Sequence, residues 1–189
     1  MNQVQVPVDI QFSYFHFMDM KPGVCIPTDC MLPLFTGMPS YSPIITLSSN
    51  CIGKNLNKNT RGVYVILIWH PQNILSPVYV GSGDIYKRLT NHINFLKKGN
   101  NFMENSTPKY FYELLEDIDQ SYWMVTWNAC DNERFYENEV YHALNNGPYL
   151  VNARATIKDE RSYCRYQNKK AEERVENIRI LFNPYIKNV

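Results

Sequence analysis

Residues 62–69 read GVYVILIW and residues 77–81 read PVYVG, and these two stretches decide the fold. The first is a continuous run of β-branched and aromatic residues, which predicts a strand covered on both faces. The second predicts another strand, and residues 71–76 form the expected loop between them. Together they predict an antiparallel hairpin.

Helices and one further strand are expected downstream of the hairpin. Asp84 is a suitable N-cap for a helix over residues 85–98, which Gly99 ends. The apolar stripe of this helix comprises Ile85, Leu89, Ile93 and Leu96. The other expected elements are a short helix at 110–116, a strand at 122–127, a helix from 131 or 132 to about 145 and a last helix over 158–182. The pattern predicts an α+β fold, a small antiparallel sheet flanked by helices.

The length and composition indicate one folded domain with appended elements. The chain has 189 residues, of which 44% are apolar and 20% charged, and this excludes disorder and coiled coil as descriptions of the whole chain. Residues 1–60 are nearly uncharged and rich in proline, so we expect loops and short strands packed on the core. Residues 61–153 form the expected core, and residues 154–189 form a basic, helical C-terminal extension.

Charge is unevenly distributed along the chain, although its net value is only +1. Residues 61–109 carry six basic and two acidic side chains, residues 110–139 carry one and eight, and residues 140–189 carry nine and five. Two basic regions therefore flank an acidic one, and a polyanion could bind the basic parts. The alternative is that these charges are simply solvated.

Cysteine usage and hydropathy indicate an intracellular protein, cytoplasmic or, in a eukaryote, nuclear. The five cysteines are odd in number and show no spacing typical of zinc ligands, so we expect free thiols. No N-terminal signal is evident, and no apolar run reaches the roughly 18 residues that a membrane helix needs. We therefore expect no membrane partner.

Gly81-Ser82-Gly83 follows a strand and opens a helix, as a dinucleotide-binding turn does. However, Tyr86 stands where that pattern requires a third glycine. The elements that follow also do not make a parallel βαβ unit. A nucleotide cofactor is therefore not expected.

Six polar residues in one order carry the strongest functional signal. Tyr64 ends the triplet Gly-Val-Tyr, Tyr79 begins the triplet Tyr-Val-Gly, and Arg88 and His92 lie on the next helix. Glu137 and Asn152 follow downstream. This order, over residues 61–153, resembles the GIY-YIG nuclease family. Valine replaces isoleucine in both triplets, which preserves β-branched strand character.

The residue types also suit phosphodiester hydrolysis independently of the resemblance. Tyr64 and Tyr79 are expected to project from one face of the hairpin. Arg88 and His92 are one helical turn apart, and a guanidinium fork suits phosphate oxygens. The acidic residue is chosen by the resemblance, which favours Glu137 over Glu133 and Glu139. Apolar residues follow Glu137 at offsets of three, four and seven, at Val140, Tyr141 and Leu144, and these offsets are similar to those of the family's helix after its glutamate.

The resemblance implies a metal-dependent DNA endonuclease with these six residues as its catalytic set. Tyr64, alone or paired with His92, would activate the water, and Arg88 would hold the scissile phosphate. Glu137 would hold a single Mg²⁺ or Mn²⁺, which is usually bound by one or two carboxylates together with waters and phosphate oxygens. Tyr79 would position the phosphate or water, and Asn152 would brace the site.

DNA is the expected partner. The candidate contacts to its backbone are Lys87, Lys97, Lys98, Arg154 and Lys158. Restriction-like cleavage of duplex DNA is the first expectation, and a homodimer would suit a nuclease that cuts both strands of a symmetric site. The alternatives are a homing or mobile-element nuclease, a repair nuclease, or a non-catalytic domain of the same fold that binds nucleic acid or protein.

Overall fold

The fold is an α+β arrangement, as expected. It is taken from a computed structural model that describes residues 42, 44–70, 74–98, 111, 117–144, 150–151 and 161–182. The elements within these residues are β1 (Ile45–Thr46), α1 (Ser49–Asn55), β2 (Arg61–His70), β3 (Ile74–Asp84), α2 (Ile85–Lys98), the 3₁₀ turn η3 (Gln120–Tyr122), β4 (Trp123–Ala129), α4 (Glu133–Leu144) and α5 (Arg161–Phe182).

The strands form one antiparallel sheet in the order β1-β4-β2-β3, so β2 is central and β3 lies at an edge. The predicted hairpin is confirmed, although β3 begins at Ile74, three residues before the expected strand. The pairing of β2 with β3 shifts between Ile66 and Leu67, where Pro77 lies opposite Leu67. Proline has no backbone N–H to donate, so an irregular point in an edge strand is where it is tolerated.

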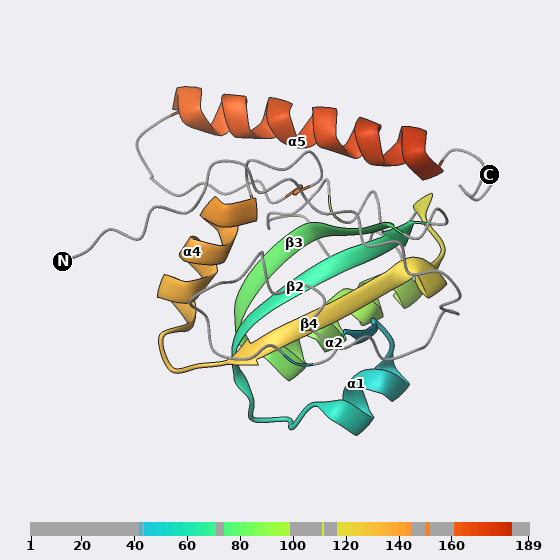
Figure 1. The fold of residues 1–189 in the computed structure, drawn as a ribbon, viewed down its shortest axis with the longest axis vertical. Coiled ribbons are helices and arrows are strands. Elements are labelled where there is room, and N and C mark those ends of the chain that lie inside the picture. The colour runs from blue at the N-terminus through green and yellow to red at the C-terminus, as the bar shows by residue number, and fades with distance from the viewer. Residues whose placement is uncertain are drawn as a thin grey trace.

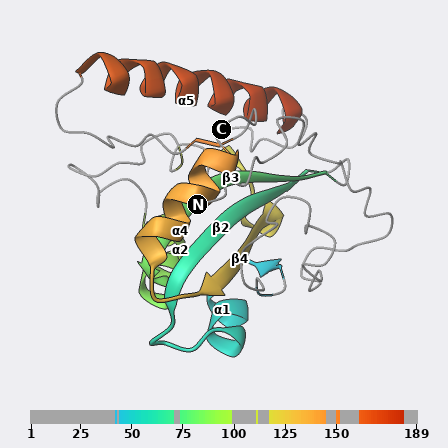
Figure 2. The ribbon, with the colours of Figure 1, turned by 60° about the vertical axis from the view of Figure 1, so that its left-hand side comes forward.

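Two layers of side chains cover the sheet, one on each face. Tyr64, Ile66 and Ile68 belong to one buried cluster together with the apolar residues of α2. Val63, Val65 and Leu67 belong to the other cluster together with the apolar residues of α4, which are Val140, Tyr141 and Leu144. The strict alternation along β2 therefore places α2 and α4 against opposite faces, as Figures 1 and 2 show.

The helix over residues 85–98 is confirmed with its cap. The backbone N–H of Lys87 donates to Asp84 Oδ1 over 3.0 Å, as an N-cap requires. Ile85, Leu89 and Ile93 are all buried. The helix expected at 110–116 lies outside the described residues except for Phe111.

Helix α1 was not expected, because residues 1–60 were predicted to form loops and short strands. The prolines of this segment end at Pro43, and Ser48 then caps the helix by accepting a hydrogen bond from the Cys51 N–H over 3.3 Å. Ile52 and Leu56 are buried in the cluster that also contains Tyr64. Residues 44–56 thus add both a strand and a helix to the core.

Helix α5 packs on the same core, on the side of the molecule beyond edge strand β3 (Figures 1 and 2). Val175 and Ile178 belong to the cluster that contains Tyr64. The buried Arg174 donates from Nη1 to the Leu150 carbonyl over 2.6 Å, and the neighbouring Val151 N–H donates to the Val78 carbonyl of β3 over 2.8 Å. These bonds connect α5 to the edge strand through residues 150–151.

Candidate active site

The side chain of Tyr64 is almost fully buried and crosses over the backbone of the edge strand. Tyr64 lies opposite Gly81 in the pairing of β2 with β3. A Cβ atom added to Gly81 would overlap the hydroxyl end of the Tyr64 ring. The glycine of the second triplet is therefore needed so that the Tyr64 ring can occupy this position.

The glycine of the first triplet has a related role. Gly62 has a φ of +156°, and a Cβ atom there would collide with the Asn128 carbonyl of β4. Any larger residue would push β2 away from β4. Both motif glycines thus permit close approach within the sheet.

His92 meets Tyr64 from α2. The Tyr64 hydroxyl lies 3.0 Å from His92 Nε2, in a buried hydrogen bond. Burial lowers the pKa of His92 from 6.5 to about 3, and the positive charge of Arg88 contributes in the same direction. The imidazole is therefore neutral near pH 7, so an unprotonated ring nitrogen can accept the phenol proton.

Aromatic rings enclose this pair. The ring of Tyr79 stacks near Tyr64 with centroids 6.2 Å apart and lies 5.3 Å from His92. Phe111 stacks on Tyr79 at 4.6 Å and meets His92 edge-on at 5.2 Å. Tyr64 and Tyr79 thus share one face of the hairpin, as expected, and Phe111 helps to exclude water from the imidazole.

Arg88 is exposed at the surface of α2, one turn before the buried His92. Arg88 and His92 are four residues apart on α2 and so lie on the same side of the helix, and the Arg88 charge contributes to lowering the His92 pKa. The site therefore combines an exposed guanidinium with a buried, neutral tyrosine–histidine pair.

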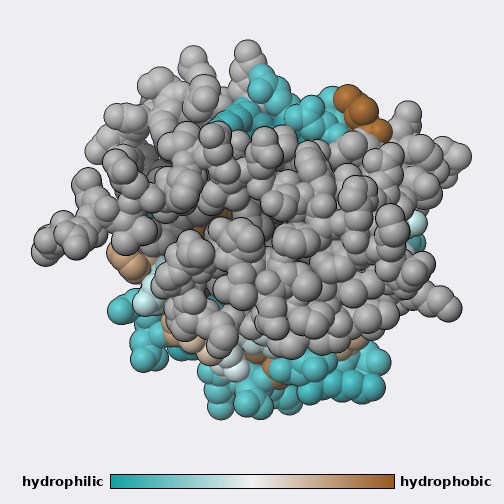
Figure 3. Space-filling view, viewed as in Figure 1, coloured by the Kyte–Doolittle hydropathy of each residue, from teal (hydrophilic) through white to brown (hydrophobic). Residues whose placement is uncertain are grey.

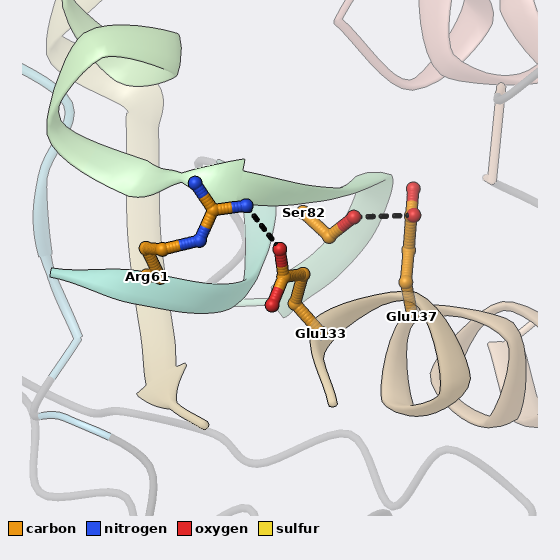
Figure 4. A network of polar contacts seen from close by, with 4 residues as sticks. All are labelled: Arg61, Ser82, Glu133 and Glu137. Carbon is orange, nitrogen blue, oxygen red and sulfur yellow. Dashed lines mark hydrogen bonds and ion pairs between the residues drawn. The ribbon is translucent and has the colours of Figure 1, made fainter. Parts of the chain in front are cut away.

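Glu137 approaches from α4, on the other side of the sheet, and meets the edge strand at Ser82. The Ser82 hydroxyl donates to Glu137 Oε2 over 2.6 Å, and Ser82 directly follows Gly81 (Figure 4). The carboxylate and the Tyr64 hydroxyl are therefore both in contact with the Gly81-Ser82 segment, from opposite faces of β3.

Glu133 lies one turn earlier on α4 and pairs with Arg61 (Figure 4). This contact raises the pKa of Arg61 and lowers that of Glu133. Glu133 is thereby engaged in a surface ion pair. Of the two described carboxylates on α4, Glu137 is the one that contacts the strand carrying Tyr79 and Gly81.

The donors around Glu137 fit a divalent ion that takes most of its ligands from water and substrate. Among the described residues, no group of three His, Cys, Asp or Glu side chains is placed to hold a metal ion. Mg²⁺ does not require such a group, since it commonly binds through one or two carboxylates and keeps several waters. A half-buried carboxylate that is fixed by a serine hydroxyl suits that kind of binding.

Several expected site residues lie outside the described part of the chain. These are Asn152, Arg154 and Lys158, together with the side chains of Lys97 and Lys98, whose backbone ends α2. Lys87 is described and exposed. Two contributors were not anticipated: Ser82 had been considered only as part of a nucleotide-binding turn, and no sequence pattern pointed to Phe111.

Comparisons with known proteins give no match: no family model, no curated protein and no solved structure matches this chain. Across the part of the chain that is described, the helices are too short or too polar to cross a lipid bilayer. The geometry and chemistry of the candidate site are therefore the basis for assigning a function.

Proposed function

We propose that the chain is a metal-dependent endonuclease of the GIY-YIG type that hydrolyses phosphodiester bonds in DNA. The observation that carries this proposal is the buried 3.0 Å contact between the Tyr64 hydroxyl and His92 Nε2, next to the exposed Arg88. Any buried tyrosine hydroxyl needs a hydrogen-bond partner, and here that partner is a neutral imidazole, which can also take up a proton.

The tyrosine–histidine pair provides a path for the proton of the attacking water. When Tyr64 donates to Nε2, its oxygen can accept a proton from water while its own proton passes to His92. Burial and the Arg88 charge both oppose a proton on His92. A phosphate bound at Arg88 would offset the second of these effects, so His92 would take up the proton more readily with substrate in place.

Arg88 and Tyr79 would orient the substrate. The planar guanidinium of Arg88 can hold two phosphate oxygens and offset the charge that develops on phosphorus. Tyr79, half-buried beside His92, would fix the position of the phosphate or the water.

Glu137 would hold one Mg²⁺ or Mn²⁺, with Ser82 orienting the carboxylate. The ion would supply Lewis-acid stabilisation of the phosphate and the leaving oxygen. Restriction-like cleavage of duplex DNA is the role that we propose. Helix α5 supports it, because its buried face makes this C-terminal element part of the packed core.

The test is cleavage of plasmid DNA with Mg²⁺, with and without a chelator, by the wild type and by Glu137→Gln. Glutamine keeps an oxygen that can accept the Ser82 hydrogen bond but removes the charge, so we expect metal-dependent cleavage to be lost while DNA binding persists. Glu133→Gln is the matched control on the same helix. It should retain cleavage, because a surface ion pair contributes roughly 0–1 kcal/mol to stability. Wild-type activity in Glu137→Gln, or no cleavage by the wild type with Mg²⁺ or Mn²⁺, would contradict the proposal.

A further inference from the structure

The segment that contains α1, the hairpin and α2 has a large excess of basic residues. Residues 49–98 carry seven lysines and arginines and one acidic residue, Asp84. Asp84 is engaged as the N-cap of α2. Two of these lysines, Lys54 and Lys58, come from α1 and the turn that follows it.

Local hydrogen bonds hold these lysines next to α2. Lys54 lies in the last turn of α1, and Lys58 lies in a turn that the Thr60 N–H closes by donating to the Asn57 carbonyl over 3.1 Å. The Thr60 carbonyl then accepts the Ile85 N–H at the start of α2 over 3.0 Å. Because α1 also packs against α2, Lys54, Lys58 and Lys87 lie on neighbouring elements, and these three residues are here called the α1–α2 surface.

The three lysines of the α1–α2 surface are exposed, and none forms an ion pair with a described residue. Two of the described arginines, in contrast, form ion pairs: Arg61 pairs with Glu133, and Arg179 pairs with Asp117 over 2.8 Å. Figure 3 shows a hydrophilic area at the lower end of the molecule, where Figure 1 places α1 in the same orientation. This surface therefore offers cationic groups to an external partner.

The described outer side of α5 has the opposite charge. Its exposed residues include Glu172, Glu173 and Glu176, whereas Arg174 is buried against the Leu150 carbonyl. The described part of the C-terminal helix is thus poorly suited to a polyanion. The α1–α2 surface leads instead to Arg88, which follows Lys87 and carries the proposed phosphate contact.

On this basis we propose that Lys54 and Lys58, together with Lys87, bind the phosphate backbone of duplex DNA beside the scissile bond. This proposal rests on the proposed nuclease function and assigns the path of its substrate. An anionic membrane fits less well, because the apolar residues Ile52 and Leu56 face the core and are not available to enter a bilayer.

The experiment compares the wild type and three variants in binding to a fluorescently labelled duplex, with chelator present to prevent cleavage, over a series of salt concentrations. Each phosphate contact contributes roughly 0.9 to the slope of log affinity against log salt. We expect Lys54→Gln/Lys58→Gln to lower that slope by about 1.8 and to weaken binding about 10- to 100-fold at 0.1 M salt. Lys54→Arg/Lys58→Arg keeps the charges and should bind like the wild type.

Lys170→Gln on α5 is the matched charge control, and circular dichroism checks that each variant is folded. This control should bind like the wild type, because Lys170 lies on a different element from the α1–α2 surface. If wild-type protein cuts DNA but the glutamine double variant keeps the wild-type slope, the inference alone is wrong. The same holds if the arginine double variant binds as weakly as the glutamine one. If the wild type neither binds nor cuts DNA, the nuclease function and this inference are both wrong. The same holds if the wild type binds vesicles of anionic lipid, tested in parallel, but not the duplex.

Discussion

Removal of the Tyr64 hydroxyl distinguishes a role in catalysis from a role in stability. Tyr64→Phe keeps the ring over Gly81 but removes the hydroxyl that hydrogen-bonds to His92 Nε2. Leaving a buried ring nitrogen without that partner costs about 1–3 kcal/mol of stability. Loss of a group that transfers or positions a proton costs about 10² to 10⁴ in rate. We therefore expect a large drop in single-turnover cleavage beside a modest drop in melting temperature.

Tyr122→Phe is the control, because Tyr122 is half-buried next to the same core but lies outside the catalytic set. It should change neither quantity by a comparable amount. A Tyr64→Phe protein that cleaves at the wild-type rate would remove Tyr64 from the mechanism and leave His92 as the candidate base.

Because the Tyr64 ring occupies the space next to Gly81, we expect alanine at Gly81 and alanine at Gly53 to have opposite effects on stability. Gly81→Ala would place a methyl group against the Tyr64 hydroxyl, so the ring or strand must move, and we expect a loss of about 1–3 kcal/mol. Gly53→Ala in α1 meets no atom within 4 Å. Because alanine is about 0.5–1 kcal/mol better than glycine inside a helix, it should stabilise the protein. Urea denaturation measures both, and equal effects of the same sign would contradict this account of Gly81.

At the scale of elements, α5 depends on one buried cation. Arg174 donates to the Leu150 carbonyl. Burial lowers the pKa of Lys170, and the positive charge of Arg174 contributes in the same direction. Arg174→Met keeps the aliphatic stem but removes the donor, and we expect a loss of about 1–3 kcal/mol. Glu173→Ala on the exposed side should stay within about 0.5 kcal/mol. Chemical denaturation would distinguish them, and an Arg174→Met protein as stable as the wild type would show that the contact is not needed.

The elements that the sequence predicted well are those whose apolar periodicity is long and unambiguous. Continuous apolar runs predicted β2 and β3, and apolar stripes predicted α2 and α4. The structure buries these apolar residues in the core. Helix α1 was missed because it is only seven residues long and has one buried residue, Ile52, with Leu56 buried at the C-cap, which is too little to show a period. The sequence feature that marks this helix is the N-cap Ser48. A single serine does not predict a helix, because serine is also common in turns and loops.

The relative positions of site residues were predictable within a helix or a hairpin. Helix geometry fixes Arg88 relative to His92, and the pairing of β2 with β3 fixes Tyr64 relative to Tyr79. The contact of Phe111 with His92 could not be predicted, because it depends on tertiary packing between distant segments.

At the scale of the whole molecule, the candidate catalytic groups come from opposite faces of the sheet. The tyrosine–histidine pair lies on the α2 face, and Glu137 comes from the α4 face. Both reach the Gly81-Ser82 segment of edge strand β3: the Tyr64 ring occupies the space that a side chain at Gly81 would fill, and Glu137 accepts the Ser82 hydrogen bond.

The burial of His92 makes the stability of the whole protein depend on pH. The pKa of His92 in the folded protein is lowered from 6.5 to about 3 by burial and by the Arg88 charge. Between these values the unfolded chain binds a proton that the folded protein does not. The free energy of unfolding therefore falls as pH decreases from about 6.5 towards 3, by about 1.4 kcal/mol per pH unit.

His92→Gln isolates this contribution, because glutamine does not titrate and its amide can still meet the Tyr64 hydroxyl. We expect urea denaturation to show that the wild type loses about 2 kcal/mol more than the variant between pH 7 and pH 5. The other histidines and all carboxylates are present in both proteins, so their contributions cancel in the difference. The variant can be less stable than the wild type at pH 7 without affecting the comparison, since the prediction concerns the slope. Parallel pH profiles would mean that water reaches the imidazole, and the enclosure of His92 by Tyr79 and Phe111 would then be wrong.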